Sequence, residues 1–326
     1  MPTLLSFIIP AYNIATKVER CLRSIAQLPL DKQEMEVVVI DDASTDDTAN
    51  VCERLLTELG LPHTVATQVK GGQATGRNRG LAIAQGRYVW MVDGDDEIIP
   101  ENLLQLREVL TSEEHFDLVT FNHDEVHPND IYHARIFLEQ QVMTGIEFFR
   151  QSRGGSYLWD KIYRREAIKN VRFIDGLTHI EDMCFNVHAL AQIRKVLCLP
   201  VTGYRYYRFP KAPLTGDAFR AERKKANDDS FAVYQSLYDL RNLSTGELRS
   251  ILDEKLNFEV IAHLSYVFRY DSVTDLKHYV ACYRGMGFFP LQKTHNRRAD
   301  LFRMLVNHTN LLLAAQWLRI KLRHLC

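Results

Sequence analysis

The stretch Trp90-Met-Val-Asp-Gly-Asp-Asp96 is a hydrophobic run that ends in three carboxylates within four positions. We interpret the run as a strand, and successive strand side chains point to opposite faces, so Asp93 and Asp95 project to the same side at its carboxyl end. Crowded carboxylates repel one another unless a cation joins them, and such hard oxygen ligands suit Mg²⁺ or Mn²⁺. An ion held in this way commonly bridges a diphosphate. The alternative interpretation is a solvated acidic turn.

Strand and helix patterns alternate on the amino-terminal side of this stretch. The expected strands cover residues 5–10, 35–40, 63–68 and 87–92. The expected helices cover residues 18–25, a segment from an N-cap at Ser44 or Thr45 to a stop at Gly60, and residues 72–85. Continuous apolar strands separated by helices predict a parallel sheet covered on both faces. Ligands of such sheets gather beyond the carboxyl ends of the strands, where Asp41, Asp42 and the 93–96 cluster fall.

The glycines exclude two common nucleotide-binding classes. A dinucleotide-binding fold needs Gly-x-Gly-x-x-Gly after its first strand, and here that strand leads into Pro10-Ala-Tyr-Asn13. The sequence also has no Gly-x-x-x-x-Gly-Lys-[Ser/Thr] phosphate loop. Gly72, Gly76 and Gly80 recur every four residues, which predicts one helix face packed closely on the sheet.

Composition excludes several other classes. The 326 residues carry a formal net charge of −1, which gives no electrostatic case for nucleic acid binding. The six cysteines are scattered without metal-binding or disulfide spacing, which favours a reducing compartment. The first residues do not resemble a signal peptide, and no apolar run approaches the roughly 20 residues that span a bilayer. We therefore expect a cytoplasmic protein.

Four blocks of the sequence together resemble family 2 glycosyltransferases. They are Phe7-Ile-Ile-Pro-Ala-Tyr-Asn13, Val39-Ile-Asp-Asp-Ala-Ser-Thr-Asp-Asp-Thr48, Gly76-Arg-Asn-Arg-Gly80 and Val92-Asp-Gly-Asp-Asp96. Two later blocks, Leu158-Trp-Asp-Lys-Ile-Tyr-Arg-Arg165 and Ile180-Glu-Asp-Met-Cys-Phe185, resemble acceptor-side blocks of the branch that builds bacterial capsule and lipopolysaccharide sugars. The family usually has alanine where Gly76 stands, and often an asparagine near Lys70.

The resemblance implies a GT-A fold and an inverting transfer of sugar from a nucleoside diphosphate. On the donor side it implies that Pro10, Ala11 and Tyr12 form a wall beside the base, and that Asp41 accepts a hydrogen bond from it. A uracil N3–H would suit that carboxylate; the alternative for Asp41 is a charge near a helix start. Arg77 would lie near the diphosphate or the base, or else it is an exposed helix cation.

The metal and catalytic residues implied by the resemblance are all carboxylates. Asp95 would be the main ligand of Mn²⁺ or Mg²⁺, Asp93 would lie at the ribose and the metal, and Asp96 would support them. Inversion needs a base for the acceptor hydroxyl. Asp182 is the candidate and Glu181 is the runner-up; the alternative is that both acids only favour a helix start.

On the acceptor side, Trp159 and Lys161 would form a platform, because sugars stack their C–H faces on aromatic rings. A buried core tryptophan is an equal alternative. After about residue 215 strand signals vanish and three or four helices are expected, one of them opened by a capping box at Ser244-Thr-Gly-Glu247.

We therefore expect an α/β protein with a mainly parallel central sheet flanked by helices and a helical carboxyl-terminal extension. Residues 1–110 form the donor-binding half, 111–214 the acceptor and catalytic-base region, and 215–326 the helical segment. The predicted function is transfer of a sugar, from a UDP donor, to a glycan or lipid-linked acceptor in bacterial surface polysaccharide synthesis. The rivals are a sugar nucleotidyltransferase, whose Gly-rich signature is missing, and an inactive nucleotide-sugar-binding accessory protein.

The sequence pattern of the last expected helix indicates the membrane surface as a further partner. From Arg284 onward Asp300 is the only acid among many basic residues. Leu311, Ala315, Leu318, Leu322 and Leu325 share a helix face, and Gln316, Arg319 and Arg323 lie away from it. Such a helix can lie on the inner face of the cytoplasmic membrane, or its apolar side can pack on the domain and leave the basic side solvated.

Overall fold

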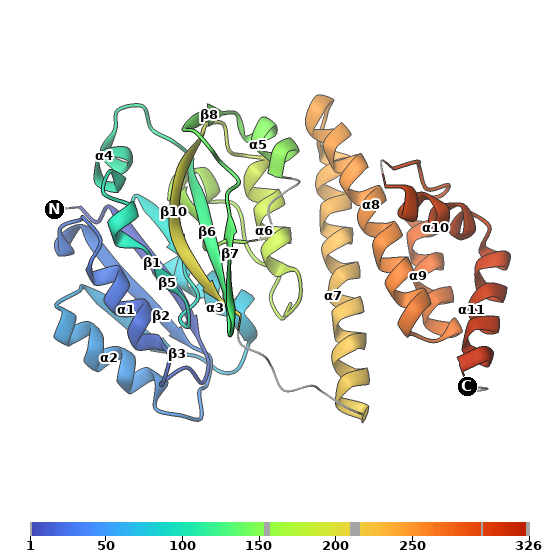
Figure 1. Ribbon diagram of the computed structural model, residues 1–326, viewed down its shortest axis with the longest axis horizontal. Coiled ribbons are helices and arrows are strands. Elements are labelled where there is room, and N and C mark those ends of the chain that lie inside the picture. Colours follow the sequence, from blue (N-terminus) through green and yellow to red (C-terminus); the bar gives the residue numbers. More distant parts are fainter. Residues whose placement is uncertain (1, 153–156, 209–215, 295, 324–326) are drawn as a thin grey trace. The chain divides into compact units, whose positions relative to one another are not determined.

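The chain forms two compact units, Met1–Pro213 and Leu214–Cys326 (Figure 1). The computed structural model describes residues 2–152, 157–208, 216–294 and 296–323. The first unit is an α/β domain built on one large sheet, and the described part of the second unit is helical. The predicted fold class is therefore confirmed.

Strands and helices alternate in the first part of the α/β unit. In order they are β1 (Leu5–Ala11), α1 (Val18–Ala26), the 3₁₀ turn η1 (Lys32–Glu34), β2 (Met35–Asp41), α2 (Thr48–Leu59), β3 (His63–Thr67), α3 (Gly72–Ile83) and β4 (Tyr88–Met91). The strands lie in the order β3-β2-β1-β4, and each neighbouring pair is parallel. β1 and β4 are buried throughout, and only one residue of β2 is partly exposed, as expected for strands covered on both faces.

The rest of the α/β unit extends this sheet with mixed pairing. Its elements are β5 (Glu97–Ile98), η2 (Pro100–Asn102), α4 (Leu106–Thr111), β6 (Leu118–His127), β7 (Asp130–Ala134), β8 (Gln141–Met143), α5 (Gly145–Ser152), β9 (Lys161–Arg164), η3 (Arg165–Ile168), α6 (Glu181–Leu190) and β10 (Val196–Tyr207). β9 joins the two halves, because it runs antiparallel between β4 and β6. β6 and β10 are parallel, and β5 closes the order at the far edge.

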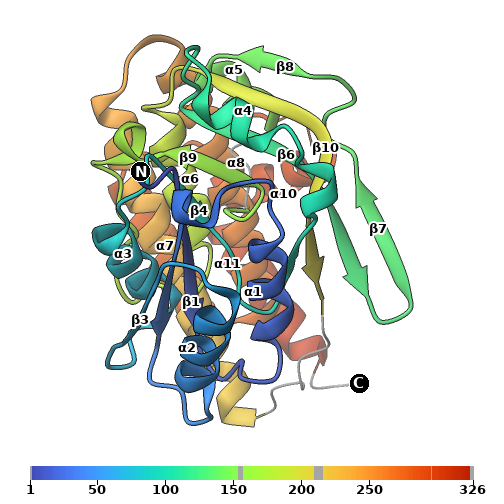
Figure 2. The ribbon, with the colours of Figure 1, turned by 90° about the vertical axis from the view of Figure 1, so that its left-hand side faces the viewer.

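Helices cover both faces of the parallel strands: α3 lies on one face, and α1 and α2 lie on the other (Figure 2). The glycines of α3 allow its close approach. A Cβ on Gly80 would come within 2.3 Å of Ile8 Cγ2, whereas a Cβ on Gly76 would make an ordinary 3.5 Å contact with Pro10 Cβ. The predicted close packing of this helix face on the sheet is confirmed at Gly80, whereas Gly76 leaves room for a Cβ.

The predicted start of α2 is wrong by a few residues. The helix begins at Thr48, with Asp47 at the N-cap position. Ser44 and Thr45 instead bind Asn13, since Ser44 Oγ accepts the Asn13 N–H at 3.0 Å and the Thr45 N–H donates to Asn13 Oδ1 at 2.8 Å. These bonds tie together the loops that follow β1 and β2.

The second unit has five helices in its described part, more than the three or four expected. They are α7 (Gly216–Leu243), α8 (Gly246–Tyr270), α9 (Val273–Gly285), α10 (Arg297–Asn307) and α11 (Thr309–Arg323). The predicted capping box at Ser244 does not form, because the Ser244 hydroxyl donates to Leu240 O at 2.7 Å and Thr245 occupies the N-cap position. Among the residues described, no helix combines the length and the apolar character needed to cross a bilayer.

Candidate active site

The carboxyl ends of β1, β2 and β4 meet at one edge of the sheet. Ala11 pairs with Asp41 across β1 and β2, and Asp93 follows the end of β4. Asp42 fixes the loop before α3, because its carboxylate accepts the N–H groups of Gly71 at 2.7 Å and Gly72 at 2.9 Å. The parallel topology therefore gathers the predicted donor-side residues at one place.

Asp41 has an unused acceptor atom. Its side chain is buried, with 3% exposed, and Oδ2 accepts the Ser44 N–H at 3.3 Å. Oδ1 is buried without a hydrogen-bond partner. A buried carboxylate oxygen without a donor is costly, so a ligand that supplies an N–H or O–H would be held strongly here.

Of the three residues predicted to line the base, only Tyr12 presents its side chain. Pro10 and Ala11 are buried in β1, whereas the Tyr12 side chain is 44% exposed. The Lys70 ammonium lies 2.9 Å from the centre of the Tyr12 ring. Lys70 therefore lies beside the predicted base site. The family often has an asparagine near this position.

Arg77 lies in the middle of α3 and bridges three carboxylates from two other parts of the chain. Its side chain is 2% exposed. Nη2 binds Asp93 Oδ1 at 3.0 Å, and Nη1 binds Asp182 Oδ1 at 2.6 Å and Glu181 Oε1 at 3.2 Å. The alternative of an exposed helix cation is therefore wrong. One guanidinium faces three acids, so negative charge remains in excess around it.

Asp182 is the second residue of α6, and the N-cap residue Ile180 adopts the left-handed region at φ 51°. Strained backbone of this kind in a β-branched residue often marks a functional site. Burial raises the pKa of Asp182 to about 7, with Glu181 and Asp93 adding to the rise and Arg77 opposing it. The side chain keeps 24% of its surface exposed, against 10% for Glu181. A partly exposed carboxyl that titrates near neutral pH suits a general base.

The acids after β4 differ in their surroundings. Asp95 is 37% exposed and lies 3.6 Å from Lys17 Nζ. Asp96 is fully buried, where Oδ2 accepts the Tyr204 hydroxyl at 3.0 Å and Oδ1 accepts the Tyr207 N–H at 2.8 Å. Burial and the neighbouring Asp93 raise the pKa of Asp96 to about 8. Asp96 thus anchors the acidic turn to β10 while Asp95 stays accessible.

The donor set fits a hard divalent cation that keeps ligands from solvent or substrate. Asp93 and Asp95 are both partly exposed. They lie in a turn after β4, which ends at Met91, so the predicted strand alternation does not extend to them. No group of three or more Asp, Glu, His or Cys side chains that could hold a metal occurs among the described residues. Mg²⁺ and its analogues are often bound by one or two carboxylates together with substrate phosphates, so two protein ligands are sufficient.

The predicted acceptor platform is not at the surface. Trp159 is 2% exposed and its ring stacks on Tyr204 at 4.6 Å and Tyr157 at 4.4 Å between centroids. Lys161 is 1% exposed and donates to Asp160 Oδ1 at 2.6 Å. Both side chains are buried, which agrees with the alternative of a core position for Trp159.

Two contacts at the site were not expected from the sequence. The Tyr204 hydroxyl accepts the Asp93 N–H at 3.2 Å while it donates to Asp96. Arg20, on α1, donates to the backbone oxygen of Asp95 at 2.5 Å. Tyr204 lies on β10 and Arg20 on the polar side of a helix, so no local motif marked either residue.

Comparisons with known proteins agree with this geometry. The sequence model described as glycosyl transferase family 2 matches residues 6–174. The "Uncharacterized glycosyltransferase EpsJ" of Bacillus subtilis (strain 168) is 25% identical over 65% of this chain and 63% of its own length. A second relative is the "Poly(ribitol-phosphate) beta-N-acetylglucosaminyltransferase TarS" of Staphylococcus aureus (strain Mu50 / ATCC 700699). It is 28% identical, and the matched region covers 62% of this chain and 35% of TarS.

A solved structure shares the fold. The crystal structure of S. aureus TarS 1–349 in complex with UDP-GlcNAc superposes with a TM-score of 0.72 at 20% identity, covering 97% of this chain and 89% of that one. This likeness identifies the GT-A fold. The family match covers more than half of the chain and includes β2 and β4 with the acids at their carboxyl ends. The chain therefore belongs to glycosyl transferase family 2.

Proposed function

We propose that this chain is an inverting glycosyltransferase that moves a sugar from a UDP-sugar to a glycan or lipid-linked acceptor. The observation that carries the proposal is the Arg77 bridge, which holds the acid after β4, Asp93, and the α6 acid, Asp182, on one guanidinium. A donor held at the strand ends would therefore lie beside a candidate base.

Binding of the nucleotide is assigned to the ends of β1 and β2. Asp41 Oδ1, which is buried and unpartnered, would accept the N3–H of uracil. The exposed Tyr12 ring would lie along the base, with Lys70 contributing a positive charge near it. TarS, whose crystal structure contains UDP-GlcNAc, supports a uridine donor.

Asp95 and Asp93 would hold Mn²⁺ or Mg²⁺. The ion, when bound, supplies positive charge to the leaving diphosphate. Another solved structure with this general fold, the mannosyltransferase PcManGT of Pyrobaculum calidifontis, is described as a complex with GDP-Man and Mn²⁺. Arg77 would keep Asp93 turned toward α6, and Asp96 would hold the turn against β10.

The chemical step needs one base. Asp182, with a pKa of about 7, would take the proton of the acceptor hydroxyl as that oxygen bonds to the anomeric carbon. The bond from that carbon to the diphosphate breaks with its electron pair on the diphosphate. Attack opposite the leaving group inverts the anomeric centre in one displacement, and no covalent enzyme intermediate forms.

The acceptor is proposed to be a bacterial surface glycan, such as lipopolysaccharide, capsule or a related polymer. TarS is named for poly(ribitol-phosphate), a polymer of this general kind. The enzyme would act in the cytoplasm, at the inner face of the membrane where lipid-linked acceptors are exposed. The carboxyl-terminal helices would make the peripheral contact.

A donor screen tests the proposal. The purified chain is incubated with UDP-, GDP-, TDP- and CDP-sugars, with Mn²⁺ or with EDTA, and release of the nucleoside diphosphate is measured. We expect turnover with a UDP-sugar that EDTA abolishes. Release of pyrophosphate from a sugar phosphate and a nucleoside triphosphate would identify a nucleotidyltransferase instead. Binding of a nucleotide sugar without turnover, over a panel of acceptors, would favour the inactive accessory protein.

A further inference from the structure

The exposed side of α11 is apolar, and its buried side contains a polar residue. Leu311, Ala314, Trp317, Leu318 and Lys321 are exposed and recur at helical spacing. Three of them are large and more than half exposed, at 60% for Leu311, 52% for Trp317 and 54% for Leu318. A helix that packs by its hydrophobic face alone would bury its apolar side chains and expose its polar ones.

The polar residue on the opposite side has a structural use. Gln316 is fully buried, and its Nε2 donates to Asp271 O at 3.1 Å and to Ser272 O at 3.3 Å. Leu312 is buried beside it. Within the second unit these bonds fix how α11 is rotated, so Leu311 and Leu318 do not face the interior of that unit. Of the face predicted from the sequence, Leu325 and the side chain of Leu322 lie outside the described part of the chain.

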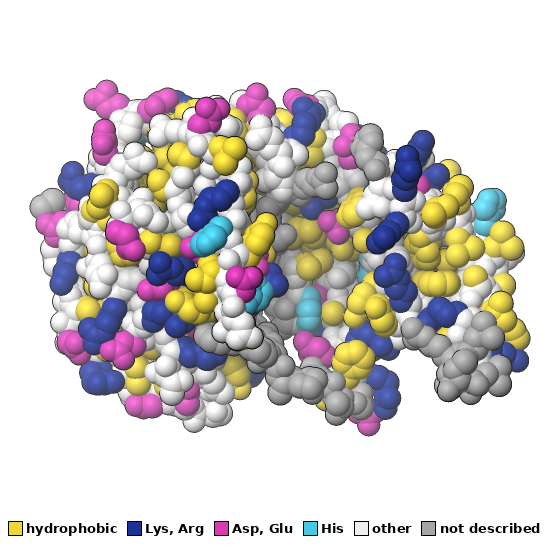
Figure 3. All heavy atoms as spheres, viewed as in Figure 1, with side chains coloured by type: hydrophobic (Ala, Val, Ile, Leu, Met, Phe, Trp, Pro, Cys, Tyr) yellow, Lys and Arg dark blue, Asp and Glu magenta, His cyan; other side chains and the backbone are white. Residues whose placement is uncertain are grey.

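The neighbouring helix α10 extends this character. Leu301 and Met304 are exposed, at 66% and 50%, and Arg297 lies one turn before Leu301 on the same side of the helix. Hydrophobic side chains gather over the carboxyl-terminal helices in the space-filling view, with Lys and Arg side chains among them (Figure 3). We define the two-helix surface as these exposed residues of α10 and α11: Arg297, Arg298, Leu301, Met304, Leu311, Ala314, Trp317, Leu318 and Lys321.

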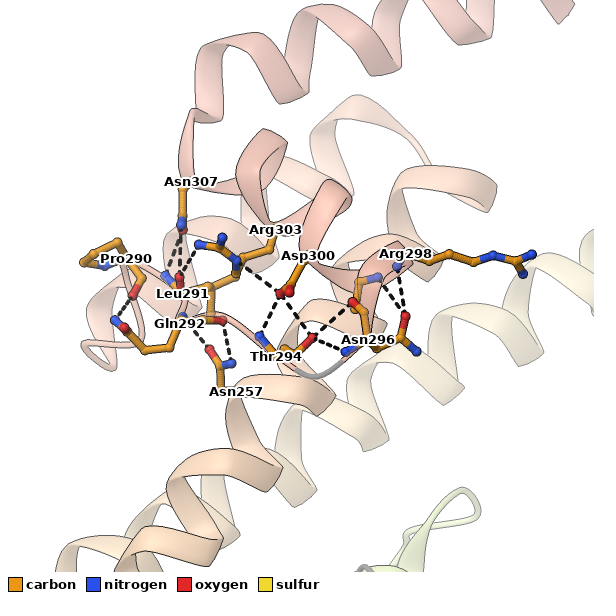
Figure 4. A network of polar contacts seen from close by, with 11 residues as sticks. Asn257, Pro290, Leu291, Gln292, Thr294, Asn296, Arg298, Asp300, Arg303 and Asn307 are labelled. Atoms are coloured by element: carbon orange, nitrogen blue, oxygen red, sulfur yellow. Dashed lines mark hydrogen bonds and ion pairs between the residues drawn. The ribbon is translucent and has the colours of Figure 1, made fainter.

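The acid of α10 does not neutralise this surface. Asp300 Oδ1 accepts the Thr294 N–H at 2.7 Å and lies 3.4 Å from Arg303 Nε, within a network that anchors the loop before α10 (Figure 4). The Arg298 N–H is capped by Asn296 at 3.0 Å, while the Arg298 side chain extends away from the network (Figure 4). Because Asp300 is turned into the network, the cations of the two-helix surface are left uncompensated by any acid of α10 or α11.

We propose that the two-helix surface binds an anionic lipid bilayer, with the apolar stripe of α11 inserted at the headgroup boundary. Exposed leucines beside a tryptophan, with cations at the rim, match the chemistry of that interface. Lys321 Nζ lies 4.1 Å from the Trp317 ring centre, so the ring can enter the interface while the ammonium meets a lipid phosphate. Membrane binding itself does not depend on the proposed function. Only its biological use, access to a lipid-linked acceptor, rests on the proposed function.

Vesicle flotation of the full chain tests the proposal. The probes are phosphatidylcholine vesicles with and without phosphatidylglycerol. We expect wild type to float with the anionic vesicles only. The partition coefficient of the variant W317E/L318E onto these vesicles should be at least tenfold lower than that of wild type. Leu243→Glu is the matched control, because Leu243 is 85% exposed at the end of α7, away from the two-helix surface in sequence, and should float like wild type.

A charge variant separates the two contributions. R297E/R298E should weaken binding by roughly fivefold per cation removed, and the loss should shrink at high salt. Acids in the first turn of α10 favour the helix dipole, so this variant should fold. Equal flotation of W317E/L318E and Leu243→Glu would overturn the proposal. So would a wild-type dimer that W317E/L318E converts to a monomer without any vesicle binding, since the surface would then join two copies. UDP release, measured without vesicles, reports separately on the proposed function.

Discussion

Replacement of Asp182 by asparagine should slow transfer and, at alkaline pH, stabilise the α/β unit. The variant keeps the size of the side chain, but an amide cannot take the proton of the acceptor hydroxyl. Loss of a general base typically lowers turnover by roughly 10²–10⁴-fold. Donor binding uses the strand ends around Asp41 and Asp95, so calorimetry with UDP and Mn²⁺ should give an affinity close to that of wild type.

The effect on stability follows from the pKa. Asp182 titrates at about 7 in the fold against an ordinary value of 3.8, and each pKa unit corresponds to about 1.4 kcal/mol. A fully shielded group would thus cost about 4 kcal/mol when ionised, and solvent contact reduces this to about 2 kcal/mol. The folded pKa is raised, so the penalty is absent below pH 4, grows toward pH 7 and is complete above it. Asp182→Asn should therefore raise Tm at pH 8 by roughly 4–8 °C, with the gain fading near pH 4.

Two assays check the reasoning: acceptor-dependent UDP release, and thermal unfolding at pH 8 and pH 4. Glu181→Gln serves as the control and should reduce turnover less. Near-normal transfer by Asp182→Asn, with none by Glu181→Gln, would show that the wrong carboxylate was chosen. Full activity of both variants would place the base elsewhere. A loss of stability at pH 8 would identify Asp182 as a structural charge of the helix start.

Further outcomes are expected elsewhere in the site. Wild-type kcat/KM should fall as pH drops below about 7, because Asp182 must be unprotonated to act as a base; a flat profile from pH 5 to 8 would contradict this. Asp95→Asn should lose most Mn²⁺-dependent UDP affinity in calorimetry, and unchanged affinity would remove Asp95 from the metal site. Asp41→Ala should weaken UDP binding about tenfold or more, since it removes a charged acceptor; equal affinity would show that its free oxygen faces no ligand. Gly80→Ala should cost about 1–3 kcal/mol in denaturant unfolding because its Cβ meets Ile8, while Gly76→Ala should be neutral or stabilising, and similar values for both would refute the packing argument.

The parallel half of the sheet could be predicted because its signals are local. The apolar run in β2 and the acids that follow it lie within one stretch of sequence, and parallel topology alone brings Asp41 and Asp93 to the same edge. The partners of Arg77 could not be predicted in the same way. Its carboxylates lie 16, 104 and 105 positions along the chain, so only the folded sheet shows that the guanidinium bridges them.

Burial was harder to predict than element type. Trp159 follows a loop and could equally have been a surface platform; the rings of Tyr157 and Tyr204, contributed by different segments, decide that it is core. The helical pattern of α11 was clear, but periodicity does not say which side faces the protein. Hydrogen bonds from Gln316 to the start of α9 decide that question, and they involve residues some 45 positions away.

The Arg77 bridge also bears on how such enzymes could be recombined. A donor-binding segment ending near residue 110 looks like a unit that could be exchanged between relatives to change the transferred sugar. Such a graft would carry Arg77 and Asp93 but leave Glu181 and Asp182 behind, and it would also separate β4 from its neighbour β9. The buried guanidinium would then meet foreign side chains in place of two of its anions. A chimera that exchanges donor specificity must therefore transplant β9 and the first turn of α6 together with the amino-terminal strands.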